Sequence, residues 1–200
     1  MRSLPALSAA ALAMALTAPG SRLGATPAPL KIDAEHSTIG FSVRHLYTRV
    51  QGMFRTFEGK ITFDESSPAA STVQATIRAA SIDTNVAARD KHLKSDSFFD
   101  TDTFPTITFV SSSVSATSEK TLRIAGALTM HGVTKPVTLD AQFVGKGKDP
   151  WGNVRYGFHA TTTVNREDFG MHWNEALETG GILVGNEIEI TLEIEAIQQP

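Results

Sequence analysis

The feature of this chain that most constrains its fold is a strict alternation of apolar and polar residues near its C-terminal end. Residues 186–196 read NEIEITLEIEA, in which Ile188, Ile190, Leu192 and Ile194 alternate with glutamate or threonine. Successive side chains of a β-strand leave opposite faces of the sheet, so this pattern predicts a strand with one apolar and one polar side. It leaves open whether the apolar side meets a packed core or a molecule that the protein holds.

Similar alternation recurs along the chain and predicts eight strands. The runs cover residues 39–45, 57–63, 73–77, 107–109, 122–130, 137–143, 156–164 and 188–194. Turn-forming stretches such as DESSPAAS, HGVTKP and GKGKDPWGN separate them. Eight antiparallel strands with mostly short connections fold as a sandwich or close as an up-and-down barrel, and closure removes the exposed sheet edges. We therefore expect an all-β fold.

Residues 82–100 lack the alternation and predict a short helix. With Asn85 as the N-cap, Val86, Asp90 and Leu93 would share one helical face. This helix would plug one end of the sheet structure.

Residues 165–185 predict a lid-like loop with at most one helical turn, at residues 174–178, that Gly180 and Gly181 close. The two connections carry unusually apolar side chains, which either form a satellite core or line a gate for a ligand. These side chains are Phe98, Phe99, Phe169, Met171 and Trp173.

Composition excludes several classes of function. The 200 residues, 41% hydrophobic and 20% charged, suit one globular domain with a proper core. The formal net charge of −3 offers no basic surface for nucleic acid. The chain has no cysteine, so it has neither a thiol nucleophile nor a thiolate metal site.

The first residues have the layout of a secretory signal peptide. A weakly basic start precedes the apolar run LPALSAAALAMAL, and small residues suitable for cleavage follow it. The run is shorter than the roughly 20 apolar residues that cross a bilayer. We expect residues 1–25 to be removed, with cleavage within residues 20–28, and the mature protein to be periplasmic or secreted.

The inward-facing rows contain small residues between bulky ones, which suggests a tube. An eight-stranded barrel is just wide enough to be filled by side chains or to hold one small ligand. The alternative is that these residues only accommodate the taper and bends of the barrel. They are Gly59, Ala75, Gly126, Ala141 and Ala160.

Catalytic patterns are sparse. None of the six histidines forms an HxH or HExxH pair, and no phosphate-binding loop occurs in a strand-loop-helix context. The best candidates for a general acid or base are Asp90 and His92, although Asp90 can equally form an ion pair with Arg89 on the helix surface. We therefore expect no metal, no cofactor and no catalytic residue.

Many unlike segments, in one order, resemble the YceI-like polyisoprenoid-binding proteins. The segments are IDAEHSTIGFSVRHL, FRTFEGKITFDESSPAAS, SIDTN, RDKHLKSDSFFD, FPTITF, GALTMHGVTKPVTLDAQF, DPWGN, NREDFGM and WNEALETGGILVGNEIEITLEIEA. The resemblance implies a lipocalin-like, eight-stranded antiparallel barrel with a short helix over residues 30–197, exported in bacteria, that holds an isoprenoid or similar lipid. Lys94, Ser97 and the loop at residues 47–49 depart from the family pattern at the polar rim.

We expect the lipid chain to contact the inward rows and its polar head to meet Arg89 and Arg166, because guanidinium groups offer a planar fork of donors. The predicted lining comprises Phe41, Val43, Phe57, Ile61, Phe63, Ala75, Ile77, Phe109, Ile124, Leu128, Leu139, Phe143, Phe158, Ala160, Phe169, Trp173, Ile190 and Leu192.

The leading functional hypothesis is a carrier or reservoir that shields a polyisoprenoid, quinone-like or fatty acyl chain from water, with at most transient contact to a membrane or a second copy. One alternative is an isomerase or hydrolase that acts on a hydrophobic substrate through Asp90 and His92. Another is a structural module with a filled core and no ligand.

Overall fold

The computed structural model describes residues 27–178 and 180–200, which form an antiparallel β-structure with few helices. The strands are β1 (Ala28–Ile32), β2 (Thr38–His45), β3 (Thr48–Phe54), β4 (Phe57–Phe63), β5 (Thr72–Arg78), β6 (Ile82–Asp83), β7 (Thr106–Ala116), β8 (Thr121–Met130), β9 (Val133–Lys148), β10 (Val154–Asn165) and β11 (Val184–Gln198). The helices are α1 (Ala87–Lys94) and the 3-10 helices η1 (Pro68–Ala70), η2 (Ala79–Ser81) and η3 (Arg166–Phe169). No helix in this part of the chain is both long and apolar enough to span a membrane.

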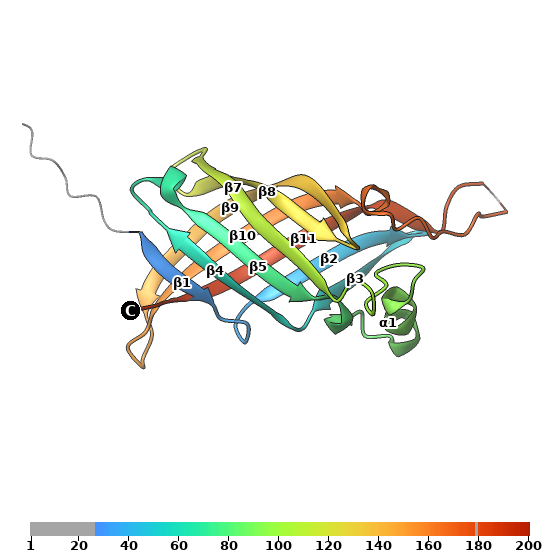
Figure 1. The fold of residues 1–200 in the computed structure, drawn as a ribbon, viewed down its shortest axis with the longest axis horizontal. Coiled ribbons are helices and arrows are strands. Elements are labelled where there is room, and N and C mark those ends of the chain that lie inside the picture. The colour runs from blue at the N-terminus through green and yellow to red at the C-terminus, as the bar shows by residue number, and fades with distance from the viewer. Residues whose placement is uncertain (1–26, 179) are drawn as a thin grey trace, which may run out of the picture.

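The sheet closes on itself as an eight-stranded barrel. Its strands follow the order β1-β4-β5-β7-β8-β9-β10-β11, and β11 hydrogen-bonds back to β1. The remaining strands, β2, β3 and β6, continue this wall at one end, where β2 pairs with β11 and β3 pairs with both β2 and β6. Figure 1 shows the elongated barrel with α1 at that end and the C-terminus at the other. The predicted closed, antiparallel barrel with one short helix is confirmed.

Four aromatic rings and an ion-pair cluster lie at one end of the barrel. The rings of Phe63, Phe143, Tyr156 and Phe158, which we call the aromatic floor, have centroids 5.0–6.2 Å apart. Beside this floor, the Arg155 guanidinium donates to carboxylates of three other chain segments. These are Asp33 after β1, Asp149 in the β9–β10 turn and Glu195 on β11. Because one cation joins three segments, this end of the barrel is held as a unit.

The helix differs from its prediction at its start. Asn85 has a left-handed backbone (φ 61°), its N–H donates to Asp83 Oδ1 at 2.9 Å, and Val86 is the N-cap residue. Val86 is 45% exposed. Of the three residues expected on one helical face, Leu93 packs against the core. Asp90 accepts hydrogen bonds from Thr84, so this face combines one core contact, one polar contact and one exposed side chain.

The lid-like loop contains no helical turn among its described residues 174–178. Ala176 and Ile182 form an isolated antiparallel bridge there, and the Asn174 amide exchanges hydrogen bonds with the backbone of Val184. The helical turn lies earlier, at η3, where the Asn165 side chain accepts the Glu167 N–H. Gly170 then ends η3 with a left-handed backbone (φ 79°).

The predicted signal peptide at residues 1–25 lies outside the described residues. The barrel strands extend from Ala28 to Gln198, so β1 begins slightly before the predicted domain of residues 30–197 and β11 ends one residue after it.

Candidate functional site: an apolar cavity in the barrel

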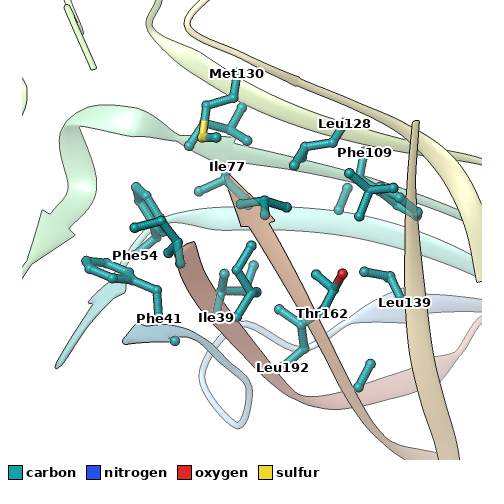
Figure 2. A pocket seen from close by; sticks show the side chains of 18 of the residues that line it. Ile39, Phe41, Phe54, Ile77, Phe109, Leu128, Met130, Leu139, Thr162 and Leu192 are labelled. Carbon is teal, nitrogen blue, oxygen red and sulfur yellow. The ribbon is translucent and has the colours of Figure 1, made fainter. Parts of the chain in front are cut away.

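The barrel encloses an apolar cavity of about 230 Å³. Thirty-seven residues line it, and all except Ser71, Thr162 and Arg166 are apolar or glycine. Figure 2 shows side chains from opposite walls, among them Ile39, Phe109 and Leu192, converging on one space. A cavity with this lining offers a long apolar group contacts on all sides and very few hydrogen bonds.

The alternating row of β11 faces this cavity. Ile188, Ile190, Leu192 and Ile194 all line it, and each is only half-buried although it points into the barrel. Inward side chains in a packed core touch neighbours on every side and lose nearly all their exposed surface. The half-burial of the whole row therefore indicates a hollow interior.

Fourteen of the eighteen residues predicted as lining surround the cavity. They are Phe41, Val43, Ile61, Phe63, Ala75, Ile77, Phe109, Ile124, Leu128, Leu139, Phe158, Ala160, Ile190 and Leu192. Their contact with a ligand stays a prediction.

Four predicted residues do not line the cavity, because they pack against protein. Phe143 belongs to the aromatic floor, and Phe57 is buried in the core cluster. Phe169 is 1% exposed within η3. Trp173 packs on the rings of His92 and Phe98, at centroid distances of 4.8 and 5.2 Å, and so joins the α1 region to the lid-like loop.

Residues beyond the predicted eighteen also line the cavity, and three of them, Phe98, Phe99 and Met171, were expected to form either a satellite core or a gate. Ile39, Leu122 and Ile188 stand on the same alternating rows as the predicted ones, so parity alone identifies them. Leu93, Phe98, Phe99 and Met171 come from the connections at the α1 end, where no alternation marks the inward side. They line the cavity there as apolar side chains in otherwise polar segments.

The small inward residues fall into two groups. Ala75, Ala141 and Ala160 line the cavity. Gly59 and Gly126 instead provide seats for neighbouring side chains, since a Cβ atom there would lie 2.5 Å from Ile32 Cδ1 or from Phe109 Cζ. Thus the alanines leave the cavity open, whereas the two glycines make room for the side chains of Ile32 and Phe109.

Arg166 is a buried cation at the edge of the cavity. Its side chain, 3% exposed, donates to the carbonyl oxygens of Gly185 and Met171 and to Asn186 Oδ1. Among the described residues, no carboxylate oxygen lies within 4.0 Å of its guanidinium. Burial lowers the pKa of this group, because an apolar environment disfavours the charged form. The Glu167 carboxylate acts on this charge only from beyond ion-pair distance, and it raises the pKa less than burial lowers it.

Arg89, the other predicted head-group residue, is placed differently. Its Nε donates to Thr84 Oγ1 and its Nη2 to the Thr84 carbonyl, each at 2.8 Å. It is absent from the lining of the cavity. The structure therefore gives Arg89 a role in holding the start of α1.

Asp90 and His92 do not form an acid-base pair. Asp90 Oδ1 accepts from Thr84 N and Thr84 Oγ1, at 2.9 and 2.6 Å. The His92 ring lies edge-on between Phe98 and Trp173. Each group is engaged with a different partner, so the geometry does not support the catalytic alternative.

Asp33, His36 and Glu195 bring three potential metal ligands together at the opposite end. Arg155 Nη1 already donates to both carboxylates. The Arg155 guanidinium therefore supplies the positive charge that a metal ion would supply between Asp33 and Glu195.

A closed antiparallel barrel around an apolar cavity defines a class of proteins that hold hydrophobic molecules. This chain belongs to the YceI-like family, whose domain model matches residues 30–196. A UPF0312 protein of Pseudomonas putida (strain GB-1) is 41% identical over 194 residues, which cover 96% of each chain.

Solved structures show the same fold. BcnA of Burkholderia cenocepacia superposes with a TM-score of 0.74 at 23% identity, over 82% of this chain and 98% of that one. A polyisoprenoid-binding domain from Saccharophagus degradans superposes with a TM-score of 0.62 at 16% identity, over 86% of this chain and 99% of that one.

Proposed function

We propose that this protein binds a lipid with a long apolar chain, such as a polyisoprenoid, a quinone-like molecule or a fatty acyl chain, and acts as its carrier or reservoir. The observation that carries this proposal is the hollow, apolar interior with its half-buried row on β11. Membership of the YceI-like family and the likeness to a polyisoprenoid-binding domain support it.

The hydrophobic effect is large enough for useful affinity without a charged anchor. Burial of 10 to 20 methylene groups at about 0.8 kcal/mol each yields roughly 8 to 16 kcal/mol. Loss of translational, rotational and conformational freedom opposes binding by about 4 to 15 kcal/mol. Since apolar contacts are non-directional, we expect loose selectivity among chains of similar length.

Native mass spectrometry of the protein from its own host compartment tests this function. We expect a mass increment that disappears after extraction with organic solvent, and tandem fragmentation then identifies the lipid. Protein that carries no lipid, and that takes up none of the three chain types in vitro, would contradict the proposal.

We further propose that Arg166 receives the polar head of the bound lipid. In residues 27–178 and 180–200, no carboxylate lies within 4.0 Å of its guanidinium, and a head with an acceptor oxygen would compensate that buried charge in a medium of low dielectric constant. Arg89 offers a matched control because it lies outside the cavity lining.

The head-group proposal is tested by the variants Arg166→Met and Arg89→Met. We expect Arg166→Met to lower affinity for a fatty acid about tenfold more than affinity for an alkane of equal length, and Arg89→Met to leave that ratio unchanged. Should Arg166→Met not fold, the wild-type protein must still prefer the acid. Equal affinity of wild-type protein for acid and alkane would contradict the role of Arg166.

We also propose that the protein is exported through its N-terminal signal and works in the periplasm or outside the cell, as its apolar N-terminal run supports. Lipid exchange there would involve transient contact with a membrane or with a second copy.

A further inference from the structure

Two neighbouring strands of the barrel separate before they end. The β9–β10 ladder runs from the pair Lys148 and Val154 as far as Asp140 and Thr161, where the pairing stops. Yet β9 extends back to Val133, paired with β8 on its other side, and β10 extends to Asn165, paired with β11. We call this unpaired stretch, between residues 133–139 and 162–165, the seam.

Side chains hold the seam together in place of a ladder. Thr162 Oγ1 donates to the Thr138 carbonyl at 2.9 Å, and His131 Nδ1 lies 2.9 Å from the Phe169 carbonyl beyond the seam. Along the seam, β9 carries the residues that protect a free sheet edge from pairing with another strand. Lys135 and Pro136 are exposed there, and proline has no N–H to donate. Separation of the two strands therefore breaks no backbone ladder.

A polar groove lies on the outside of the barrel next to the seam, over the paired strands β10 and β11. Val137, Leu139, Thr162 and Val164 line the cavity on the inner side of the seam. The outer groove is formed by Asp140, Thr161, Thr162, Thr163, Glu189, Ile190 and Thr191. Thr162 and Ile190 border both spaces. The two carboxylates of the groove are paired, Asp140 with Arg123 and Glu189 with Arg49, so its surface is polar with largely balanced charge.

We infer that the lipid enters and leaves sideways through the seam, with its polar head in the outer groove. This inference rests on the proposed lipid-binding function and specifies the route of exchange. The head would cross hydroxyl and carboxylate groups and reach Arg166, which directly follows Asn165 at the end of the seam. A head with hydroxyl or carbonyl groups suits this path better than a polyphosphate, because the residues that form the groove contribute hydroxyl groups and carboxylates and no cation.

The ends of the barrel offer less direct routes. At one end, the rings of the aromatic floor pack against one another, so a polar head that left there would pass aromatic side chains. At the other end, the rings of His92, Phe98 and Trp173 join the α1 region to the lid-like loop. Passage along the barrel axis would also carry the polar head past an almost wholly apolar lining, which polar groups disfavour.

Cross-linking across the seam tests the route, and the chain has no cysteine to interfere. Thr138 and Thr163 would be the next outward-facing partners if the register of Asp140 and Thr161 continued. The variant Thr138→Cys/Thr163→Cys is closed by oxidation or, where the sulfurs do not meet, by a short bifunctional thiol reagent. The matched control is Lys60→Cys/Gln74→Cys, a register pair of exposed residues in the β4–β5 ladder.

The readout is release of cis-parinaric acid, a fluorescent fatty acid, from preloaded protein to lipid vesicles. We expect the closed seam to slow release at least tenfold, with reduction of the disulfide restoring the rate, and the control cross-link to leave it unchanged. Unchanged release from the closed seam, with binding intact, would overturn the lateral route and leave the proposed function standing. Failure of the wild-type protein to bind the probe would remove the basis of both.

Discussion

At the scale of single residues, substitution of Ala75 can show whether the interior of the barrel is hollow or filled. It is half-buried, lines the cavity and pairs with Gly59 and Phe109 on its two neighbouring strands. A larger side chain here would occupy space that the lipid chain otherwise uses, and the same holds for Ala160 on the opposite wall.

We predict that Ala75→Phe and Ala160→Phe abolish binding of long-chain lipid while the circular dichroism spectrum and melting temperature stay nearly unchanged. Gln74→Phe, on the exposed outer face beside Ala75, is the control and should bind normally. In a packed interior, both inward changes would cost about 1 to 3 kcal/mol of stability, which is a fall of several degrees. Such a fall, with binding retained, would contradict the hollow interior.

Residue-level prediction from sequence succeeded where strand parity applies. Alternation identified the inward side of β11 and most of the lining, because side-chain direction in a strand follows directly from position. It failed for Phe143, which points inward but packs on the Phe63 ring, and for Trp173, which lies in a connection and packs on the His92 ring. Whether an inward side chain meets space or a neighbouring ring depends on the opposite wall, which a local pattern does not contain.

At the scale of elements, Arg155 ties three chain segments at the floor end of the barrel. Its guanidinium holds the pKa of the Asp149 carboxyl well below the ordinary value of 3.8. Burial raises the pKa of Asp33, but the hydrogen bonds from Arg155 and His36 outweigh this effect, and the net pKa is lowered. A carboxyl with a lowered pKa stabilises the folded state above its unfolded pKa, and this contribution is lost as the pH falls through the folded value.

We therefore predict that Arg155→Met lowers the melting temperature at pH 6 and that the difference from wild type shrinks between about pH 5 and pH 2. Thermal unfolding across that range measures it. Arg123→Met removes an exposed pair on the outer wall, whose contribution should be small at every pH. A difference between wild type and Arg155→Met that does not change with pH would show that these ion pairs contribute nothing to acid stability.

Elements with their own local signal were predictable from sequence, and those that depend on partners were not. The eight alternating runs became strands. In β3, Gly52 and polar residues interrupt the pattern, and the strand forms because β2 pairs with it and the Phe41 ring packs over Gly52. Residues 174–178, for which at most one helical turn was predicted, form none, because Asn174 bonds to Val184 on β11, a contact that local sequence does not specify.

At the scale of the whole molecule, the proposed export would determine where the mature chain begins. We predict that the mature protein starts between Ser21 and Pro29. Cleavage in this range would remove the apolar run and leave β1, which begins at Ala28, almost intact for pairing with β4 and β11. N-terminal sequencing of protein from the cell envelope measures the start. Recovery of the protein with Met1 in the cytoplasm would contradict export.

Because the interior is hollow, thermal unfolding of this protein should report how much of it carries a lipid. A ligand that binds only the folded state stabilises it by RT ln(1 + [L]/Kd), about 2.7 kcal/mol at one hundred times Kd. For a chain of this size we predict an upward shift of about 5 to 10 °C in differential scanning calorimetry when delipidated protein is reloaded. The loaded form should also unfold with a larger heat capacity change, since more apolar surface becomes hydrated. A partly loaded preparation with slow exchange should then melt in two steps, whose relative areas report the fraction that carries lipid.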